Sequence, residues 1–145
     1  MRNTLWASLL WASLSCALSA AAAAEDGPVG RWLTQDRDGV IEVAPCGTGL
    51  CGRIVGLTYG AHEPMPVDAQ GRPQCGLVIF AMQPEGDRWR GRITNPEDGS
   101  EWRAEIWMGE DGALRLRGYL GIPLLGRTQI WTRFQGRIGA GCRFG

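Results

Sequence analysis

The sequence predicts an all-β protein, folded as a single up-and-down antiparallel β-barrel of about eight strands. Apolar residues recur with a period of two through most of the chain after the first 24 residues, which is typical of strands with one buried face. Glycine, aspartate and asparagine interrupt this pattern about every ten residues, as hairpin joints do. A barrel of this size either fills itself with side chains or holds one small ligand.

The chain begins with the features of an export signal. Arg2 supplies a positive start, Leu5–Leu14 is apolar, and small residues end at Ala24, where we expect cleavage. The apolar run is shorter than the ~20 residues of a membrane span, so we expect no stable membrane insertion and an exported, periplasmic protein. The chain then divides into a signal peptide (1–24), a barrel domain (25–134) and a glycine-rich C-terminal tail (135–145).

Each predicted strand is short, alternates in polarity and ends at a turn signal. Asp38-Gly39, Glu85-Gly86-Asp87 and Asp111-Gly112 are examples of these joints, and only Tyr59–Gln74 forms a long connection. The strands are expected near Val29–Thr34, Val40–Ala44, Gly52–Thr58, Gly76–Met82, Arg88–Thr94, Glu101–Met108, Leu114–Tyr119 and Arg127–Phe134.

Charged residues alternate with apolar ones along three of these strands. Arg88, Arg90 and Arg92 share one face of the fifth strand, and Glu105 lies on the matching face of the sixth. We expect this ladder of arginine and glutamate to face water on the outside of the barrel, where each cross-strand pair contributes roughly 0.2 to 1 kcal/mol.

Four cysteines follow the predicted signal, and an oxidising compartment would allow three disulfide pairings among them. Cys46 and Cys51 flank Gly47–Leu50, which we interpret as a four-residue hairpin loop, so we expect these two to be joined. A zinc site is disfavoured, because the chain has one histidine and no Cys-x2-Cys spacing. Cys75 and Cys142 are either joined to each other or free.

The last predicted strand places an unusual set of side chains on one face. Arg127, Gln129, Trp131 and Arg133 alternate with two threonines and Ile130. If Trp131 faces inward, Arg127 and Gln129 become the candidate polar groups of a ligand site. An inward guanidinium needs a partner, which is either an internal carboxylate or a bound anion. A bulge near the start of this strand would invert the faces and place Arg127 in water.

The residues needed for other functions are scarce. The chain has no lysine, and without Arg2 its fourteen arginines face fifteen acidic residues, a net charge of −1 that argues against a nucleic-acid partner. His62 lies in the long loop, and no serine has a nucleophile motif. No glycine-rich phosphate loop is present, so we expect no cofactor, no metal and no enzymatic activity.

Several motifs resemble one family of bacterial proteins. Gly30–Thr34, Pro45–Val55, Arg117–Gly121 and Gly126–Arg133 are similar, in order and spacing, to the domain-of-unknown-function family numbered 2147. The resemblance implies a small exported protein with a lipocalin-like barrel, and it brings no reaction or ligand. It also implies a barrel closure in which Arg133 stacks on the indole of Trp32 in a cation–π contact.

The leading functional hypothesis is non-covalent binding of a small molecule, partly apolar and anionic, inside the barrel. The alternative is a structural or protein-interaction module of the cell envelope with a filled barrel, and a periplasmic enzyme comes third. The two leading hypotheses differ in what the tryptophans do: they line a cavity in the first and form a solid core in the second. Ligand, protein partner and oligomeric state are left open by the sequence.

Overall fold

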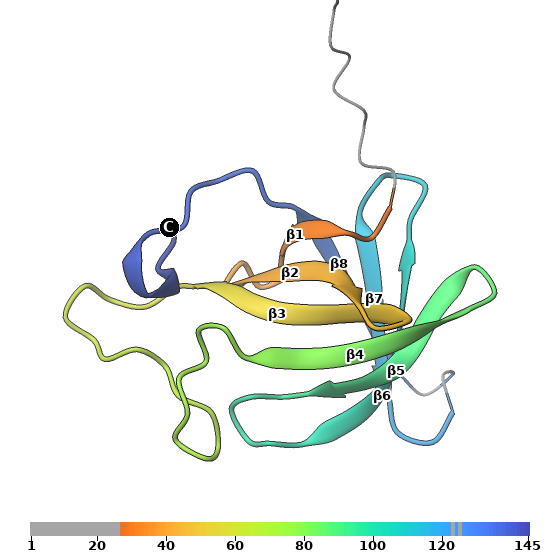
Figure 1. Ribbon diagram of the computed structural model, residues 1–145, viewed down its shortest axis with the longest axis horizontal. Coiled ribbons are helices and arrows are strands. Elements are labelled where there is room, and N and C mark those ends of the chain that lie inside the picture. The colour runs from red at the N-terminus through yellow and green to blue at the C-terminus, as the bar shows by residue number, and fades with distance from the viewer. Residues whose placement is uncertain (1–26, 123, 125) are drawn as a thin grey trace, which may run out of the picture.

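The predicted fold class is confirmed by the computed structural model, which describes residues 27–122, 124 and 126–145 (Figure 1). The strands form a closed barrel in which each is antiparallel to its neighbours along the chain. The predicted signal peptide and its cleavage site lie outside the described residues. The strands are β1 (Gly30–Leu33), β2 (Gly39–Cys46), β3 (Gly49–Leu57), β4 (Val78–Glu85), β5 (Arg88–Thr94), β6 (Glu101–Met108), β7 (Leu114–Tyr119) and β8 (Arg127–Arg133).

Pairing between the first and last strands closes the barrel. Trp32 lies opposite Arg133, and Leu33 lies opposite Thr132. The β7–β8 register runs without interruption from Leu114 to Gly118, so no bulge inverts the faces of β8. Irregular register occurs instead within β2–β3 and β3–β4. The side-chain alternation predicted for β8 therefore stands, with Thr128, Ile130 and Thr132 exposed on the outer face.

The hairpin between β2 and β3 is tighter than the sequence predicted. Pairing continues to Cys46 opposite Gly49, so two residues join the strands instead of four, and Gly47 takes a φ of 56°, which favours glycine. The disulfide between Cys46 and Cys51 therefore links diagonal positions of the hairpin, with Cα atoms 5.7 Å apart. The predicted disulfide is present, although the two strands that carry it pair on a different register from the predicted one.

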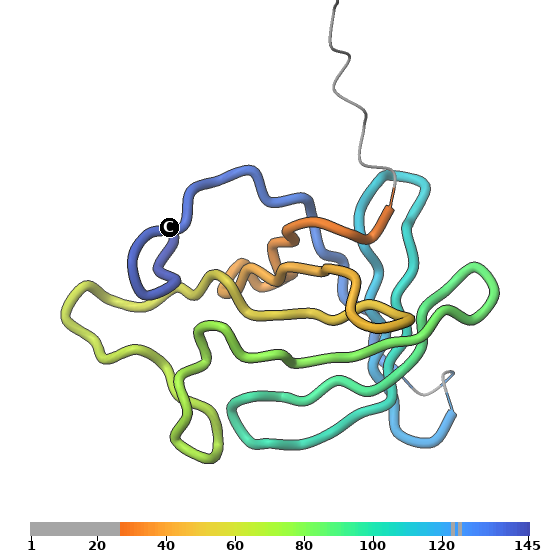
Figure 2. Tube along the Cα trace, viewed as in Figure 1, coloured from red at the N-terminus to blue at the C-terminus, as the bar shows by residue number. Residues whose placement is uncertain are grey.

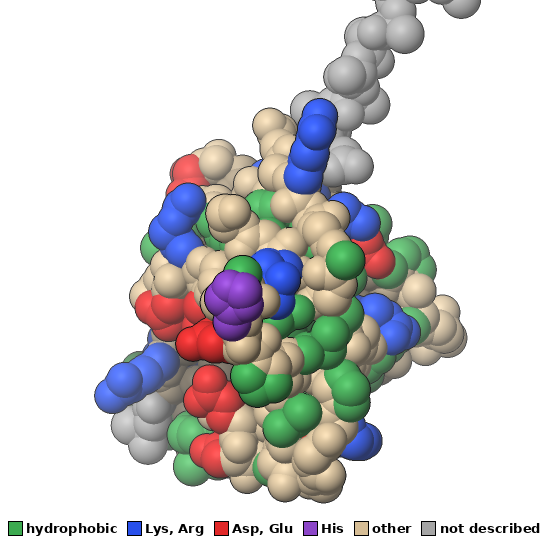
Figure 3. All heavy atoms as spheres, turned by 90° about the vertical axis from the view of Figure 1, so that its left-hand side faces the viewer, with side chains coloured by type: hydrophobic (Ala, Val, Ile, Leu, Met, Phe, Trp, Pro, Cys, Tyr) green, Lys and Arg blue, Asp and Glu red, His purple; other side chains and the backbone are tan. Residues whose placement is uncertain are grey.

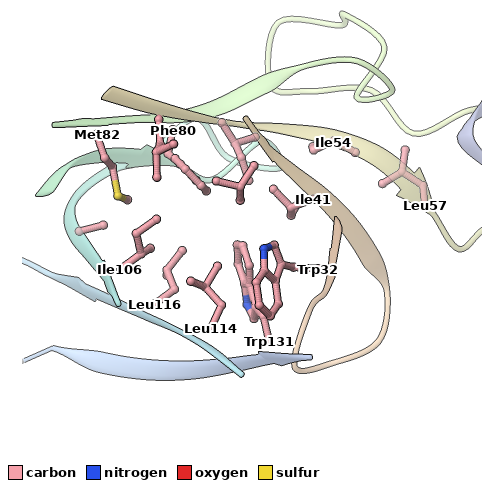
Figure 4. Close-up of a cluster of buried hydrophobic side chains, with 14 residues drawn as sticks. Trp32, Ile41, Ile54, Leu57, Phe80, Met82, Ile106, Leu114, Leu116 and Trp131 are labelled. Atoms are coloured by element: carbon pink, nitrogen blue, oxygen red, sulfur yellow. The ribbon is translucent and has the colours of Figure 1, made fainter. Parts of the chain in front are cut away.

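Large apolar side chains fill one half of the barrel interior. Trp32, Ile106 and Leu114 have no exposed surface, and Met82 and Trp131 are nearly as buried. Figure 4 shows these side chains pointing inward from opposite walls of the barrel. A packed core of this kind is what holds a small β-barrel together, since burial of each large side chain contributes about 1.5 to 3 kcal/mol.

One part of the predicted outer ladder is wrong. Glu105 points outward as expected but is only 2% exposed, because the side chains of Arg88 and Arg90 cover it and pair with its two oxygens. The Arg88 guanidinium also lies over the ring of Trp107, 4.0 Å from its centre. A long arginine stem can shield a neighbouring carboxylate from water, which strand alternation alone does not reveal.

The C-terminal tail folds back onto the barrel beside the start of the long β3–β4 loop (Figure 2). Leu57 pairs with Arg143, and a disulfide joins Cys142 to Cys75 with Cα atoms 5.7 Å apart. The pairing that the sequence left open is thus present. In the described part of the chain, no helix has the length and apolar character needed to cross a bilayer.

Candidate ligand-binding site

One end of the barrel opens into a cavity. Because neighbouring strands are antiparallel, the connections after β1, β3, β5 and β7 all lie at the same end, and residues from each of these regions line a hollow of about 670 Å³. This volume lies within the range of small-molecule sites, roughly 300 to 1,000 Å³. The apolar part of the wall consists of Ile41, Ile54, Leu57, Ile79, Ile93, Trp102 and Leu116.

The opposite end of the barrel is closed by an arginine stacked on a tryptophan. The Arg133 guanidinium lies 4.0 Å from the centre of the Trp32 ring and donates hydrogen bonds to the carbonyls of Val29 and Gly27. The Trp32 indole N–H donates to the Pro28 carbonyl at 2.8 Å. The segment before β1 is thereby fastened across this end, as the family resemblance implied for Trp32 and Arg133.

The three candidate ligand-binding residues of β8 take different positions. Arg127 and Gln129 both line the cavity, Arg127 near the open end and Gln129 one inward position further along the strand. Trp131 lies deeper, is only 3% exposed and is absent from the cavity wall. Its indole N–H donates to the Gln129 side-chain oxygen at 2.8 Å, so Trp131 positions Gln129 instead of facing a ligand. Trp102 is the tryptophan of the wall.

The rim of the cavity carries more negative than positive charge. Asp36, Asp38 and Glu97 line it together with Arg127, and all four side chains belong to exposed residues. The Thr34 hydroxyl donates to Asp38 at 2.7 Å. Among the described residues, Arg127 has no ion-pair partner. Figure 3 views the molecule from the side that carries the long loop with His62, and acidic side chains gather along one side of that face.

Sequence reasoning missed a polar residue of the wall, Gln74. It belongs to the long loop between β3 and β4, lines the cavity and is 8% exposed. Its side-chain amide donates to the carbonyl of Val67 at 2.9 Å. The neighbouring Cys75 is tied to the C-terminal tail by its disulfide, which fixes the loop at this point. No local signal marks a lone glutamine in a loop as part of a barrel interior.

An aspartate organises the same loop. The Asp68 carboxylate accepts hydrogen bonds from the backbone N–H groups of Gln70 and Arg72 and from the Arg72 guanidinium. Burial acts to raise the pKa of Asp68, but the hydrogen bonds from Arg72 and Gln70 outweigh it, and the pKa lies below its usual value. The ionised carboxylate therefore stabilises the loop that carries Gln74.

Exposed apolar side chains stand at the same end of the barrel, on the connection between β7 and β8. Leu120, Ile122 and Leu124 are 61%, 55% and 81% exposed. His62, the single histidine of the chain, is exposed in the β3–β4 loop and does not line the cavity.

A second, smaller hollow of about 510 Å³ lies outside the barrel. It is formed where the C-terminal tail packs beside the end of β8, and Phe134 and Phe144 contribute to its wall. The two rings also pack edge to face, with centroids 5.4 Å apart. Because this hollow does not continue into the barrel interior, the larger cavity is the better candidate for a ligand site.

The closed eight-stranded barrel, plugged at one end and hollow at the other, defines a lipocalin-like protein. The chain is similar to protein HP1028 of the human pathogen Helicobacter pylori, described as belonging to the lipocalin family, with a TM-score of 0.60 and 15% sequence identity. The similarity covers 74% of this chain and 82% of that protein. At this identity, the similarity shows the fold alone.

The particular family follows from the sequence. The chain belongs to the bacterial family DUF2147, described as an uncharacterized protein conserved in bacteria, whose model matches residues 30–133. The predicted resemblance is thereby confirmed. No curated protein matches the chain. The two disulfides are consistent with an exported protein, because such bonds persist in oxidising compartments.

Proposed function

We propose that this protein binds a small, partly apolar molecule in the open half of its barrel, after export to the periplasm. The observation that carries the proposal is the half-filled interior: large side chains pack the closed end, whereas the open end holds a cavity of about 670 Å³. Apolar walls with a few convergent polar groups are the usual form of a small-ligand site.

Binding without catalysis fits the polar groups of this cavity. Gln74 and Gln129 are carboxamides, which do not exchange protons at neutral pH and so cannot act as general acid or base. Ionisable side chains of the wall, such as Asp36 and Arg127, lie at the exposed rim. Arg127, the candidate for binding an anion, shares that rim with the carboxylates of Asp36, Asp38 and Glu97, which weaken its attraction for an anionic group.

The alternative is a structural or protein-interaction module with a filled barrel, and the packed end of the core supports it. Trp32 and Trp131 are almost entirely buried there, as a solid core requires. The position of Trp102 is inconsistent with a filled barrel, because Trp102 lines the cavity and is 39% exposed. The balance favours a binding protein.

The proposal is tested by native mass spectrometry of the protein purified from the periplasm of its own organism. We expect an added mass that is lost on denaturation, and an N-terminus beginning near Glu25. Ile93→Phe, which adds volume to the cavity wall, should reduce the bound fraction, whereas Ile130→Phe on the exposed outer face should leave it unchanged. A periplasmic protein that carries no added mass and whose tryptophan fluorescence responds to no apolar probe would favour the structural module.

A further inference from the structure

Two glutamines of the cavity wall, Gln74 and Gln129, each offer an uncharged hydrogen-bonding group. Gln74 lines the cavity while more than nine-tenths of its surface is buried. Its side-chain nitrogen donates to the carbonyl of Val67, so its side-chain oxygen is the atom left to accept. Within the described residues, that oxygen accepts no hydrogen bond and is accessible to solvent. Gln74 therefore presents an acceptor to the cavity.

Gln129 presents the complementary group. An indole N–H can only donate, so the bond from Trp131 requires the oxygen of the Gln129 amide and fixes its orientation. The remaining NH2 group is a donor, and Gln129 also lines the cavity. The two glutamines reach the cavity from well-separated parts of the barrel, since one precedes β4 and the other lies on β8.

Charged groups are confined to the exposed rim. Asp36, Asp38 and Glu97 line the same rim as Arg127, so the rim carries a net negative charge that opposes the binding of an anion. The rest of the wall carries no charge: it is mainly apolar, and its polar side chains are those of Gln74, Gln129, Thr34, Thr94 and Asn95. A carboxylate or ammonium group placed against this part of the wall would lose its hydration without gaining an opposite charge, which is costly.

We propose that the ligand is an uncharged amphiphile, an apolar chain or ring system bearing amide or hydroxyl groups that donate to Gln74 and accept from Gln129. This inference rests on the proposed function and narrows it, because it excludes fatty-acid-like anions and alkyl amines as preferred ligands. Amide and hydroxyl groups both donate and accept hydrogen bonds, and they enter an apolar cavity without the desolvation cost of a full charge.

A matched series of octyl compounds tests the proposal on the full mature protein at neutral pH. Octanamide, octanol, octanoate and octylamine share one chain and differ in the charge of the head group. Their affinities are measured by the change in tryptophan fluorescence, since Trp102 lies in the cavity wall, with isothermal titration calorimetry as a second readout. We expect octanamide and octanol to bind at least about tenfold more tightly than either charged compound.

Substitutions of the two glutamines test which groups are responsible. Gln74→Leu and Gln129→Leu should each weaken octanamide binding by about fivefold to tenfold, the usual loss when one hydrogen bond is removed. Gln135→Leu, at an exposed site outside the cavity, is the matched control and should change nothing. The two test residues lie on separate elements, so misfolding of one variant leaves the other informative.

Each other outcome overturns a defined part of the reasoning. Equal or tighter binding of octanoate or octylamine would refute the uncharged ligand while leaving a binding function in place. A preference for octanamide that survives both substitutions would refute the assignment of the two amides. A folded protein that binds none of the four compounds would contradict the proposed function itself, and the inference with it.

Discussion

Replacing Arg133 with alanine should loosen the closed end of the barrel. The guanidinium lies over the Trp32 ring and holds the carbonyls of Val29 and Gly27, so one side chain joins β8, β1 and the segment before β1. Trp32 itself has no exposed surface. Removal of the arginine opens the indole face to water and leaves two carbonyls without their charged donor.

The size of the effect follows from these contacts. A cation–π contact contributes about 0.5 to 2 kcal/mol, and hydrogen bonds to a charged group contribute about 1.5 to 3 kcal/mol each when they are shielded from water. Arg133 is only partly buried, so water replaces some of the lost hydrogen bonding. We therefore expect the free energy of unfolding to fall by about 1 to 3 kcal/mol. With a urea dependence of about 2 kcal/mol per molar, the midpoint should fall by about 0.5 to 1.5 M.

Urea denaturation followed by tryptophan fluorescence measures this change. The urea midpoint of Arg133→Lys should lie between those of the wild type and Arg133→Ala, because lysine keeps the charge but lacks the planar guanidinium that stacks on the indole and donates two hydrogen bonds. Arg137→Ala is the control, since Arg137 is exposed in the tail and has no ion-pair partner within the described residues. A midpoint for Arg133→Ala equal to that of the control would refute the view that this contact closes the barrel.

Three further predictions concern the disulfides, the shielded carboxylate and the long loop. The double variant Cys75→Ser/Cys142→Ser should lower the free energy of unfolding by about 4 kcal/mol, and Cys46→Ser/Cys51→Ser should lower it by about 2 kcal/mol, because the two disulfides close loops whose ends are 67 and 5 residues apart. A smaller loss for Cys75→Ser/Cys142→Ser than for Cys46→Ser/Cys51→Ser in urea denaturation would contradict this. Glu105→Gln should lower the urea midpoint clearly more than Glu85→Gln, since Glu105 is shielded between two arginines whereas Glu85 is exposed; equal shifts would show that shielding has no energetic effect. The pKa of Asp68 is lowered in the folded protein, so its ionised form stabilises the fold above the unfolded pKa of about 3.9, and this contribution disappears as pH falls through the folded value. Asp68→Asn should therefore be less stable than the wild type at about pH 7 and should approach it in acid; a difference that does not depend on pH would refute this.

Part of the candidate site was predictable because strand alternation is a local property. Alternation on β8 placed Arg127 and Gln129 on the inner face, and an uninterrupted β7–β8 register keeps them there. Alternation could not say how far along the barrel each side chain lies. Trp131 is on the same face, yet it is buried in the core and meets Gln129 instead of a ligand.

Other parts of the site depend on contacts between distant segments. Gln74 comes from a long loop without strand periodicity, and its position is set by contacts with Val67 and by the disulfide of the next residue, Cys75. Asp36 and Glu97 belong to separate hairpins, where turn chemistry already accounts for acidic residues. They line the same rim as Arg127 because the closed barrel brings the two hairpins and the start of β8 to one end.

The sequence by itself determined the class of fold and the number of strands, and the family resemblance added the contact between Trp32 and Arg133. Strand alternation and turn residues depend on short stretches of chain, so they can be recognised without the tertiary structure. The tertiary structure decided that the barrel is packed at one end and hollow at the other, that Glu105 is shielded on the outer face, and that Gln74 joins Gln129 in the cavity. Each of these results from the volumes and reach of side chains brought together from distant strands, and one-dimensional patterning contains no measure of that packing.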